Sequence, residues 1–219
     1  MLDIPAKVTP GVGTVIVLHG WGASSRDVEL LAEALRLPKV RYLIPQGEFD
    51  VPGTGDRGKA WYSLPPDENS QRERAHSRKK LMEILTDLET EGTPPGKVVF
   101  MGFSQGASMS FDVALNYSSG EASSVKKSSG GVAAVISLSG FLLDAETMKH
   151  RKNLPTRMRV FAGHGRVDSL IPLEVGKSSI LVLRELGFDV EWKEYDADHR
   201  VVIDELEDVR RFLAKVFPL

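Results

Sequence analysis

Short apolar runs alternate with longer amphipathic segments along most of the chain. The runs are rich in β-branched residues, which is typical of strands buried on both faces of a sheet. The segments between them carry leucine, valine and alanine at helical spacing, which predicts helices that pack on that sheet. The predicted strands are 15–18, 40–44, 98–101, 132–138, 159–162 and 190–195. The predicted helices are 24–35, capped by Ser24 or Ser25, and 70–89, 107–117, 173–186 and 201–216.

This alternation predicts an α/β fold with a mostly parallel central sheet and helices on both faces. We find no internal repeat and no linker, so we expect residues 1–219 to form a single domain. Two segments depart from the pattern. Residues 45–66 form a long loop rich in glycine and proline, of a kind that is often functional in a compact domain. Residues 118–131 are rich in serine, glycine and lysine and predict a flexible surface excursion.

Composition narrows the function classes. The formal net charge is -2, which gives no long-range field to attract nucleic acid, so no nucleic-acid partner is expected. A local patch would still allow transient contact with a membrane surface. The chain has no cysteine, which excludes disulfides, thiolate metal sites and cysteine nucleophiles. The first apolar run, 15–18, is too short for a signal sequence or a membrane span, and we expect a cytoplasmic protein.

The pentapeptide Gly102-Phe103-Ser104-Gln105-Gly106 is the strongest chemical signal. The five-residue pattern alone is weak evidence, because a glycine-rich turn with an incidental serine would also match. Here it joins a predicted strand to a predicted helix, which is the context of a nucleophile elbow. Flanking glycines leave room for a strained serine whose hydroxyl projects above the sheet. We therefore predict that Ser104 is a nucleophile and that the Gln105 amide donates to an oxyanion.

A nucleophilic serine needs a base, and His199 is the best placed of the five histidines. It follows the last predicted strand, at the sheet edge where the Ser104 loop opens. His164 follows the preceding strand and is the competing candidate, whereas His76 and His150 lie in polar segments typical of the surface.

The acid that orients the base is expected between the serine and the histidine in chain order. Asp168 fits, since it follows the predicted strand 159–162. Asp196 and Asp198 are too close in sequence to His199 to orient it, and we interpret them as caps of the closing helix.

A second oxyanion donor is expected from the loop after the first core strand. The segment His19-Gly20-Trp21-Gly22 supplies it, and we predict the Trp21 amide. In this interpretation His19 is structural and orders the loop through hydrogen bonds.

Together these segments resemble the carboxylesterase/phospholipase family of α/β-hydrolases, which contains the acyl-protein thioesterases. The matching segments, in family order, are 18–22, 102–106, Leu138-Ser139-Gly140, 164–168 followed by Ile171-Pro172, Asp198-His199 and 209–213. The resemblance implies an α/β-hydrolase fold, a Ser104–Asp168–His199 triad, an oxyanion hole from the Trp21 and Gln105 amides, and acyl ester or thioester substrates. Trp61 resembles the tryptophan that the family carries in its long loop near the acyl pocket.

The chain departs from the family pattern at three places. Ala23 stands where the family usually has aspartate after His-Gly-x-Gly, and Ala107 stands where a second glycine usually follows the elbow. The excursion at 118–131 is longer than usual. These departures bear on assignment to the protein-depalmitoylating branch and leave the triad unaffected.

The expected reaction is acyl transfer to water through an acyl-enzyme, which requires no metal and no cofactor. Only about 60 residues separate Ser104 from Asp168, too few for a separate cap domain, so the site should be open. An open apolar groove suits a long acyl chain on an acylated protein or a lysolipid. Its candidate lining residues, each of which could instead pack in the core, are Trp61, Leu64, Phe141, Leu142, Leu170 and Ile171. Two alternatives stay open: a short-chain carboxylesterase or dienelactone-type hydrolase, and a catalytically weak, ligand-sensing protein with a hydrolase fold.

Overall fold

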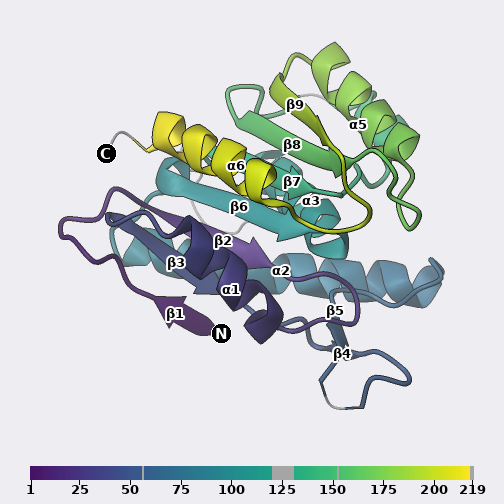
Figure 1. The fold of residues 1–219 in the computed structure, drawn as a ribbon, viewed down its shortest axis with the longest axis horizontal. Helices are drawn as coiled ribbons and strands as arrows, with labels where there is room; N and C mark the ends of the chain where they lie inside the picture. Colours follow the sequence, from purple (N-terminus) through teal and green to yellow (C-terminus); the bar gives the residue numbers. More distant parts are fainter. Residues whose placement is uncertain (56, 120–130, 152, 218–219) are drawn as a thin grey trace.

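A seven-stranded sheet organises the molecule (Figure 1). The computed structural model describes residues 1–55, 57–119, 131–151 and 153–217. The strand order is β1-β3-β2-β6-β7-β8-β9, and only β1 runs antiparallel to its neighbour. The strands are β1 (Leu2–Ile4), β2 (Gly13–Leu18), β3 (Val40–Ile44), β6 (Val98–Phe103), β7 (Ala134–Leu138), β8 (Arg159–Gly165) and β9 (Asp189–Tyr195). The predicted mostly parallel sheet is confirmed.

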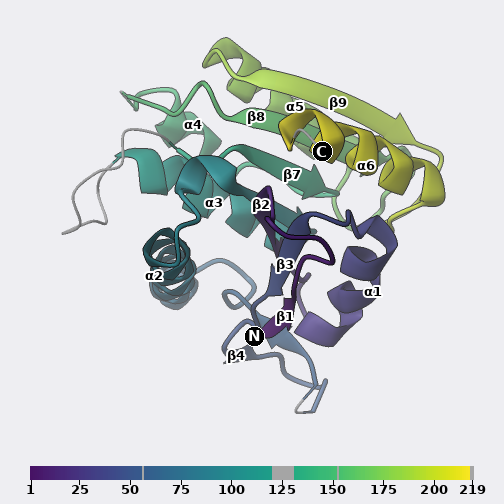
Figure 2. The same ribbon diagram turned by 90° about the vertical axis from the view of Figure 1, so that its left-hand side faces the viewer.

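Helices cover both faces of this sheet, as predicted, because successive strand residues point to opposite sides. Val15 and Val17 of β2 pack toward α1 (Ser25–Leu35) and α6 (Ile203–Val216). Ile16 and Leu18 of the same strand belong to the cluster under the other helices. Those helices are α2 (Glu68–Thr90), α3 (Gln105–Ser119) and α5 (Leu173–Glu185). Figure 2 shows α1 and α6 on one side of the sheet and α2 and α3 on the other.

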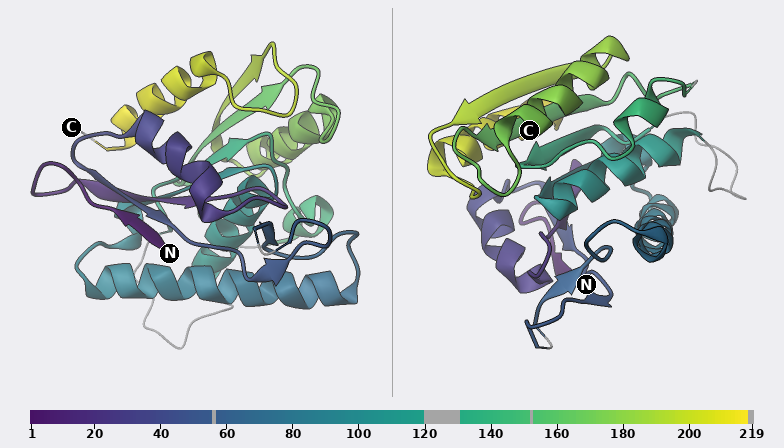
Figure 3. Two further views of the ribbon diagram at one scale, coloured as in Figure 1. Left: turned by 60° about the horizontal axis from the view of Figure 1, so that its bottom comes forward. Right: turned by 90° about the vertical axis from the view of Figure 1, so that its right-hand side faces the viewer.

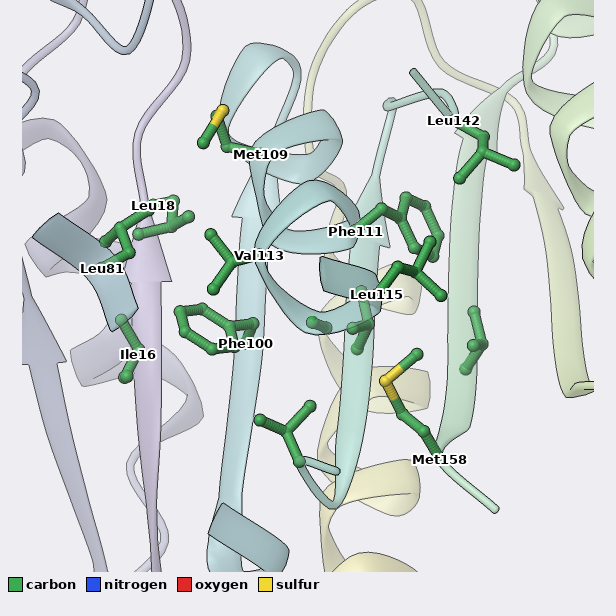
Figure 4. Packing of buried hydrophobic residues seen from close by; sticks show 14 of the residues in the cluster. Ile16, Leu18, Leu81, Phe100, Met109, Phe111, Val113, Leu115, Leu142 and Met158 are labelled. Atoms are coloured by element: carbon green, nitrogen blue, oxygen red, sulfur yellow. The ribbon is translucent and has the colours of Figure 1, made fainter. Parts of the chain in front are cut away.

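The larger core cluster lies between the sheet and α3 (Figure 4). Phe100 of β6 packs beside Val113 of α3, and both are fully buried. Burying a side chain of this size stabilises the fold by about 1.5–3 kcal/mol relative to exposing it. Because β6 and α3 flank the Ser104 turn, this packing fixes both arms of the predicted elbow.

Five short elements were not predicted. β1 adds an antiparallel edge strand that pairs Leu2 with Ile44 of β3. The loop 45–66 contains a two-stranded sheet of β4 (Phe49–Asp50) and β5 (Lys59–Ala60), which the right-hand view of Figure 3 shows at the bottom. The other two are the single-turn η1 (Pro95–Lys97) and α4 (Ala145–Met148). Elements of two to four residues are too short to produce a periodic pattern.

The predicted excursion at 118–131 falls mainly outside the described residues, since 120–130 are not among them. In the described part of the chain, no element forms a separate cap over the sheet, and no helix has the length and hydropathy needed to cross a membrane.

Candidate active site

Ser104 is the single residue between β6 and α3, and its backbone has a φ of 54°. A residue other than glycine in this left-handed region costs about 1–3 kcal/mol and persists only where its surroundings hold it. Here the Ser104 amide donates to the Leu138 carbonyl at 2.9 Å, and the Ser104 carbonyl accepts from the amides of Ala107 and Ser108 at 3.0 and 3.2 Å. The neighbouring strand and the first turn of α3 therefore hold the strained turn in place.

Both glycines of the pentapeptide are required by close backbone contacts. A Cβ on Gly102 would overlap with the Gly106 backbone, and one on Gly106 would overlap with the Leu18 carbonyl. The Ala107 methyl is fully buried and lies opposite Gly140. It fits there because Gly140 has no side chain, since a Cβ on Gly140 would collide with that methyl. Gly140 thus accommodates the departure at position 107.

His199 and Asp168 form a hydrogen-bonded pair at the same sheet edge. Asp168 lies in the turn after β8, and its Oδ2 is 2.7 Å from His199 Nδ1. Asp168 Oδ1 accepts from the amides of Leu170 and Ile171 at 3.0 and 2.9 Å. Burial disfavours the carboxylate, but the hydrogen bonds from His199 and the two amides outweigh it and lower the pKa of Asp168. An ionised Asp168 only accepts, so Nδ1 of His199 carries a proton, and in the neutral form of the ring Nε2 is then the acceptor.

The His199 ring lies against the elbow. Its centroid is 4.8 Å from that of Phe103, the residue immediately before Ser104 in the chain. The His199 side chain is 13% exposed, whereas that of Asp168 is fully buried. The His199 ring is therefore fixed by its hydrogen bond to the Asp168 carboxylate and by its contact with Phe103, and part of it remains exposed to solvent.

The competing histidine, His164, is enclosed. It is 1% exposed, and its Nε2 lies 2.8 Å from the carbonyl oxygen of Ile171, to which it donates. A Cβ on Gly176 would lie 2.6 Å from His164 Nδ1, so the ring packs directly on α5. His164 thus supports the turn that carries Asp168 and offers no surface to a substrate.

The interpretation of Asp196 and Asp198 as helix caps is wrong. Val202 is the N-cap of α6, and it makes no side-chain capping bond. Asp196 accepts from Arg166 at 2.7 Å, and Asp198 pairs with Arg200 at 3.0 Å. Both aspartates are exposed, and each forms an ion pair with an arginine and does not cap the helix amides. The two remaining histidines, His76 and His150, are exposed as predicted.

His19 orders the loop after β2 through hydrogen bonds. Its Nε2 accepts from the Gly47 amide at 2.9 Å, which leaves the proton on Nδ1, 2.8 Å from the Gly20 carbonyl. Burial lowers the pKa of His19 and keeps the ring neutral. The Trp61 indole donates to the His19 carbonyl at 2.8 Å, which ties the loop 45–66 to the same point.

The Gln105 side chain has a role that was not predicted from the sequence. Its Oε1 accepts from the Trp61 amide at 3.0 Å, and its Nε2 donates to the Tyr62 carbonyl at 2.7 Å. The residue after Ser104 therefore anchors the long loop with its side chain. Its main-chain amide, the first of α3, has no acceptor within the helix and is available to an oxyanion. Trp21, the other predicted donor, lies in the turn after β2 and is 43% exposed.

The six predicted groove residues fall into two groups. Trp61 and Leu142 are 2% and 5% exposed and belong to the core cluster, so neither has an open face in this structure. Leu64 and Leu170 are exposed, while Phe141 and Ile171 are half-buried.

A cleft that was not predicted opens beside His199. Its volume is about 480 Å³, and it lies between the turn 20–23, α1 and the segment 199–201. In the sequence, only the apolar residues Val28 and Leu31 on α1 could have indicated this cleft. Their helical spacing is equally typical of residues that pack in the core. Among the described residues, no group of three or more histidine, aspartate or glutamate side chains is arranged to hold a metal ion.

Comparison with known proteins gives consistent matches over nearly the whole chain. The sequence profile of the phospholipase/carboxylesterase family matches residues 2–217. Relatives named acyl-protein thioesterase 1 include one from Gibberella zeae, 29% identical over 94% of this chain and 91% of its own length. Another, from Yarrowia lipolytica, is 27% identical over 96% of this chain and 94% of its own length.

Solved structures share the fold. Esterase PE8 superposes with a TM-score of 0.84, at 22% identity over 99% of this chain and 98% of its own. Acyl-protein thioesterase 2 from Zea mays superposes with a TM-score of 0.80, at 23% identity over 98% of this chain and 97% of its own. These matches confirm the predicted α/β-hydrolase fold.

Proposed function

The chain belongs to the phospholipase/carboxylesterase family, and we propose that it hydrolyses acyl esters and thioesters with Ser104 as nucleophile. One observation carries the proposal. The strained Ser104 turn lies beside a histidine whose Nδ1 is held by a buried, ionised aspartate. The family resemblance predicted from the sequence is confirmed, and relatives named thioesterases support this substrate class.

In the first half-reaction His199 Nε2 accepts the Ser104 proton as Oγ attacks the acyl carbonyl carbon. Asp168 holds the imidazole in the required tautomer and stabilises the cation that forms. The carbonyl oxygen becomes an oxyanion, which the amides of Gln105 and Trp21 stabilise. The tetrahedral intermediate then collapses, and His199 donates its proton to the departing alcohol or thiol.

In the second half-reaction a water molecule takes the place of the leaving group. His199 removes its proton as the water oxygen attacks the acyl-enzyme, and collapse releases the acid and restores the Ser104 hydroxyl. The positive end of the α3 dipole, directly behind Ser104, favours the negative charge in both halves. No step requires a metal or a cofactor.

For the substrate we propose an acyl group on a protein thiol or on a lysolipid, processed in the cytoplasm by a single-domain enzyme that contacts membrane surfaces transiently and binds no nucleic acid. The exposed Leu64 and Leu170 and the half-buried Phe141 and Ile171 are the proposed contacts for the acyl chain. The printed names of the relatives support the acylated-protein assignment, while Ala23 sets this chain apart from the usual family pattern.

Covalent labelling with a fluorophosphonate probe tests the nucleophile. We expect labelling of the wild type, none of Ser104→Ala, and a loss of ester hydrolysis of at least about 10⁴-fold in that variant. Ser178→Ala is the matched control, since Ser178 is exposed on α5 and its hydroxyl bonds only within the helix. A wild type that resists the probe and hydrolyses no ester would favour the ligand-sensing alternative.

A series of substrates from acetyl to palmitoyl esters, with S-palmitoyl peptide and lysophospholipid beside it, tests the substrate class. Rates that hold or rise with acyl length support the long-chain assignment. A sharp preference for the shortest acyl groups would favour the short-chain carboxylesterase alternative instead.

A further inference from the structure

The cleft beside His199 is distinct from the proposed acyl contacts. It is bounded by the turn 20–23, by the face of α1 that carries Asp27, Val28 and Leu31, by Phe103 and by the segment 199–201. Figure 1 shows α1 and α6 on the same face of the sheet, and the two segments that close the cleft precede these helices. Leu64, Phe141, Leu170 and Ile171 come from other loops and are absent from its lining.

The walls of the cleft are apolar. Val28, Leu31, Phe103 and Val201 contribute aliphatic and aromatic surface, and Trp21, which is 43% exposed, also lines the cleft. Ala23 adds a methyl group to this lining and no charge.

The two charged residues of the cleft already have partners. The Asp27 carboxylate accepts from the Ser24 amide at 2.7 Å and from the Ser24 hydroxyl at 2.6 Å, where it completes the cap of α1. Arg200 Nε lies 3.0 Å from Asp198 Oδ1. Because neither charge needs a ligand, the cleft favours an uncharged, apolar group.

The position of His199 indicates whether the cleft binds the acyl group of the substrate or its leaving group. His199 donates a proton to the leaving oxygen or sulfur, so the leaving group lies within hydrogen-bond reach of its Nε2. His199 and Phe103, whose ring centroids are 4.8 Å apart, line the cleft together with α1. We propose that it is the leaving-group site and that it selects an apolar alcohol or thiol, with the Ala23 methyl as part of its apolar wall. Of the two proposed substrates it therefore favours the acylated protein thiol over the lysolipid, whose leaving group is charged. The inference rests on the proposed hydrolase function.

Acetate esters of alcohols from methanol to octanol test this inference, since the acyl group stays constant. We expect kcat/KM of the wild type to rise about three- to fourfold for each methylene that enters the cleft. Ala23→Asp and Leu31→Asp should each lower the ratio of kcat/KM for octyl over methyl acetate by at least about tenfold, because each places a carboxylate against the alkyl chain. Leu30→Asp is the matched control, since Leu30 is the neighbouring residue on α1 and is 77% exposed.

A second series, of methyl esters from acetate to octanoate, assigns the effect to one half of the substrate. If the Ala23 and Leu31 variants change only the alcohol series, the cleft holds the leaving group. If they change the acyl series instead, or neither series, the proposal is overturned. A wild type that hydrolyses no ester and resists the fluorophosphonate probe would overturn the hydrolase function itself, which distinguishes the two failures.

Discussion

Replacing Glu205 by glutamine is expected to stabilise the protein at neutral and alkaline pH. Glu205 lies in the first turn of α6 and is 2% exposed. Its carboxyl group packs so closely on β8 that a Cβ on Gly163 would collide with its Oε1, and that oxygen has no hydrogen-bond partner. Burial raises the pKa of Glu205 to about 8, the Val202 main chain opposes this shift, and Asp208 adds to it.

The size of the effect follows from the difference between folded and unfolded pKa. Below the ordinary value of 4.5 both states hold the proton, and the group has no pH-dependent effect. Between 4.5 and about 8 only the folded state keeps the proton, so the free energy of unfolding falls as pH rises, by about 1.4 kcal/mol per unit. The loss reaches about 3 kcal/mol at pH 7 and about 5 kcal/mol above pH 8.

Glutamine keeps the shape and the acceptor oxygen and cannot ionise, so Glu205→Gln removes this loss. Denaturant unfolding at about pH 5, 7 and 9 measures it, with the stability gain of the variant growing across the series. Glu207→Gln, on an exposed position of the same helix, removes the same charge and should show no such growth. A Glu205→Gln gain that is equal at all three pH values would refute the reasoning.

Two further predictions concern the site. Asp168→Asn should lower kcat by about 10⁴-fold with little change in Tm, because an amide can hold His199 in the wrong tautomer; steady-state kinetics with a melting curve would check this, and an active variant would contradict it. Trp61→Phe should lower the free energy of unfolding by about 1–3 kcal/mol, because the buried His19 carbonyl loses its donor; unchanged denaturant unfolding would show that this bond contributes nothing.

The long elements could be predicted from the sequence because the helices have a periodic buried face and the central strands are continuous apolar runs. Val98–Phe103 and Ala134–Leu138 are buried almost throughout, and a continuous apolar run marks such strands. β1 and the β4–β5 pair could not be predicted, because two or three residues carry no period and their pairing depends on partners distant in the chain, such as Ile44 for Leu2.

The candidate site shows the same division. The meeting of His199 with Asp168 could be predicted, because both follow parallel strands and so emerge at one sheet edge. The anchoring role of the Gln105 side chain could not, since it depends on where a distant loop folds back. The burial of Glu205 is equally invisible, because a glutamate in the first turn of a helix usually faces solvent.

The hydrogen bonds that join His19, Gly47, Trp61 and Gln105 link three segments that are distant in the chain. None of these segments can open alone without exposing a buried donor or acceptor of another. Their amides should therefore exchange with solvent hydrogen as one cooperative unit, at a rate set by the least stable of the three. A sequence change in the long loop, far from Ser104, would then also loosen the segments that carry the proposed oxyanion donors. The electrostatic preorganisation proposed for the site would depend on the loop as much as on the elbow.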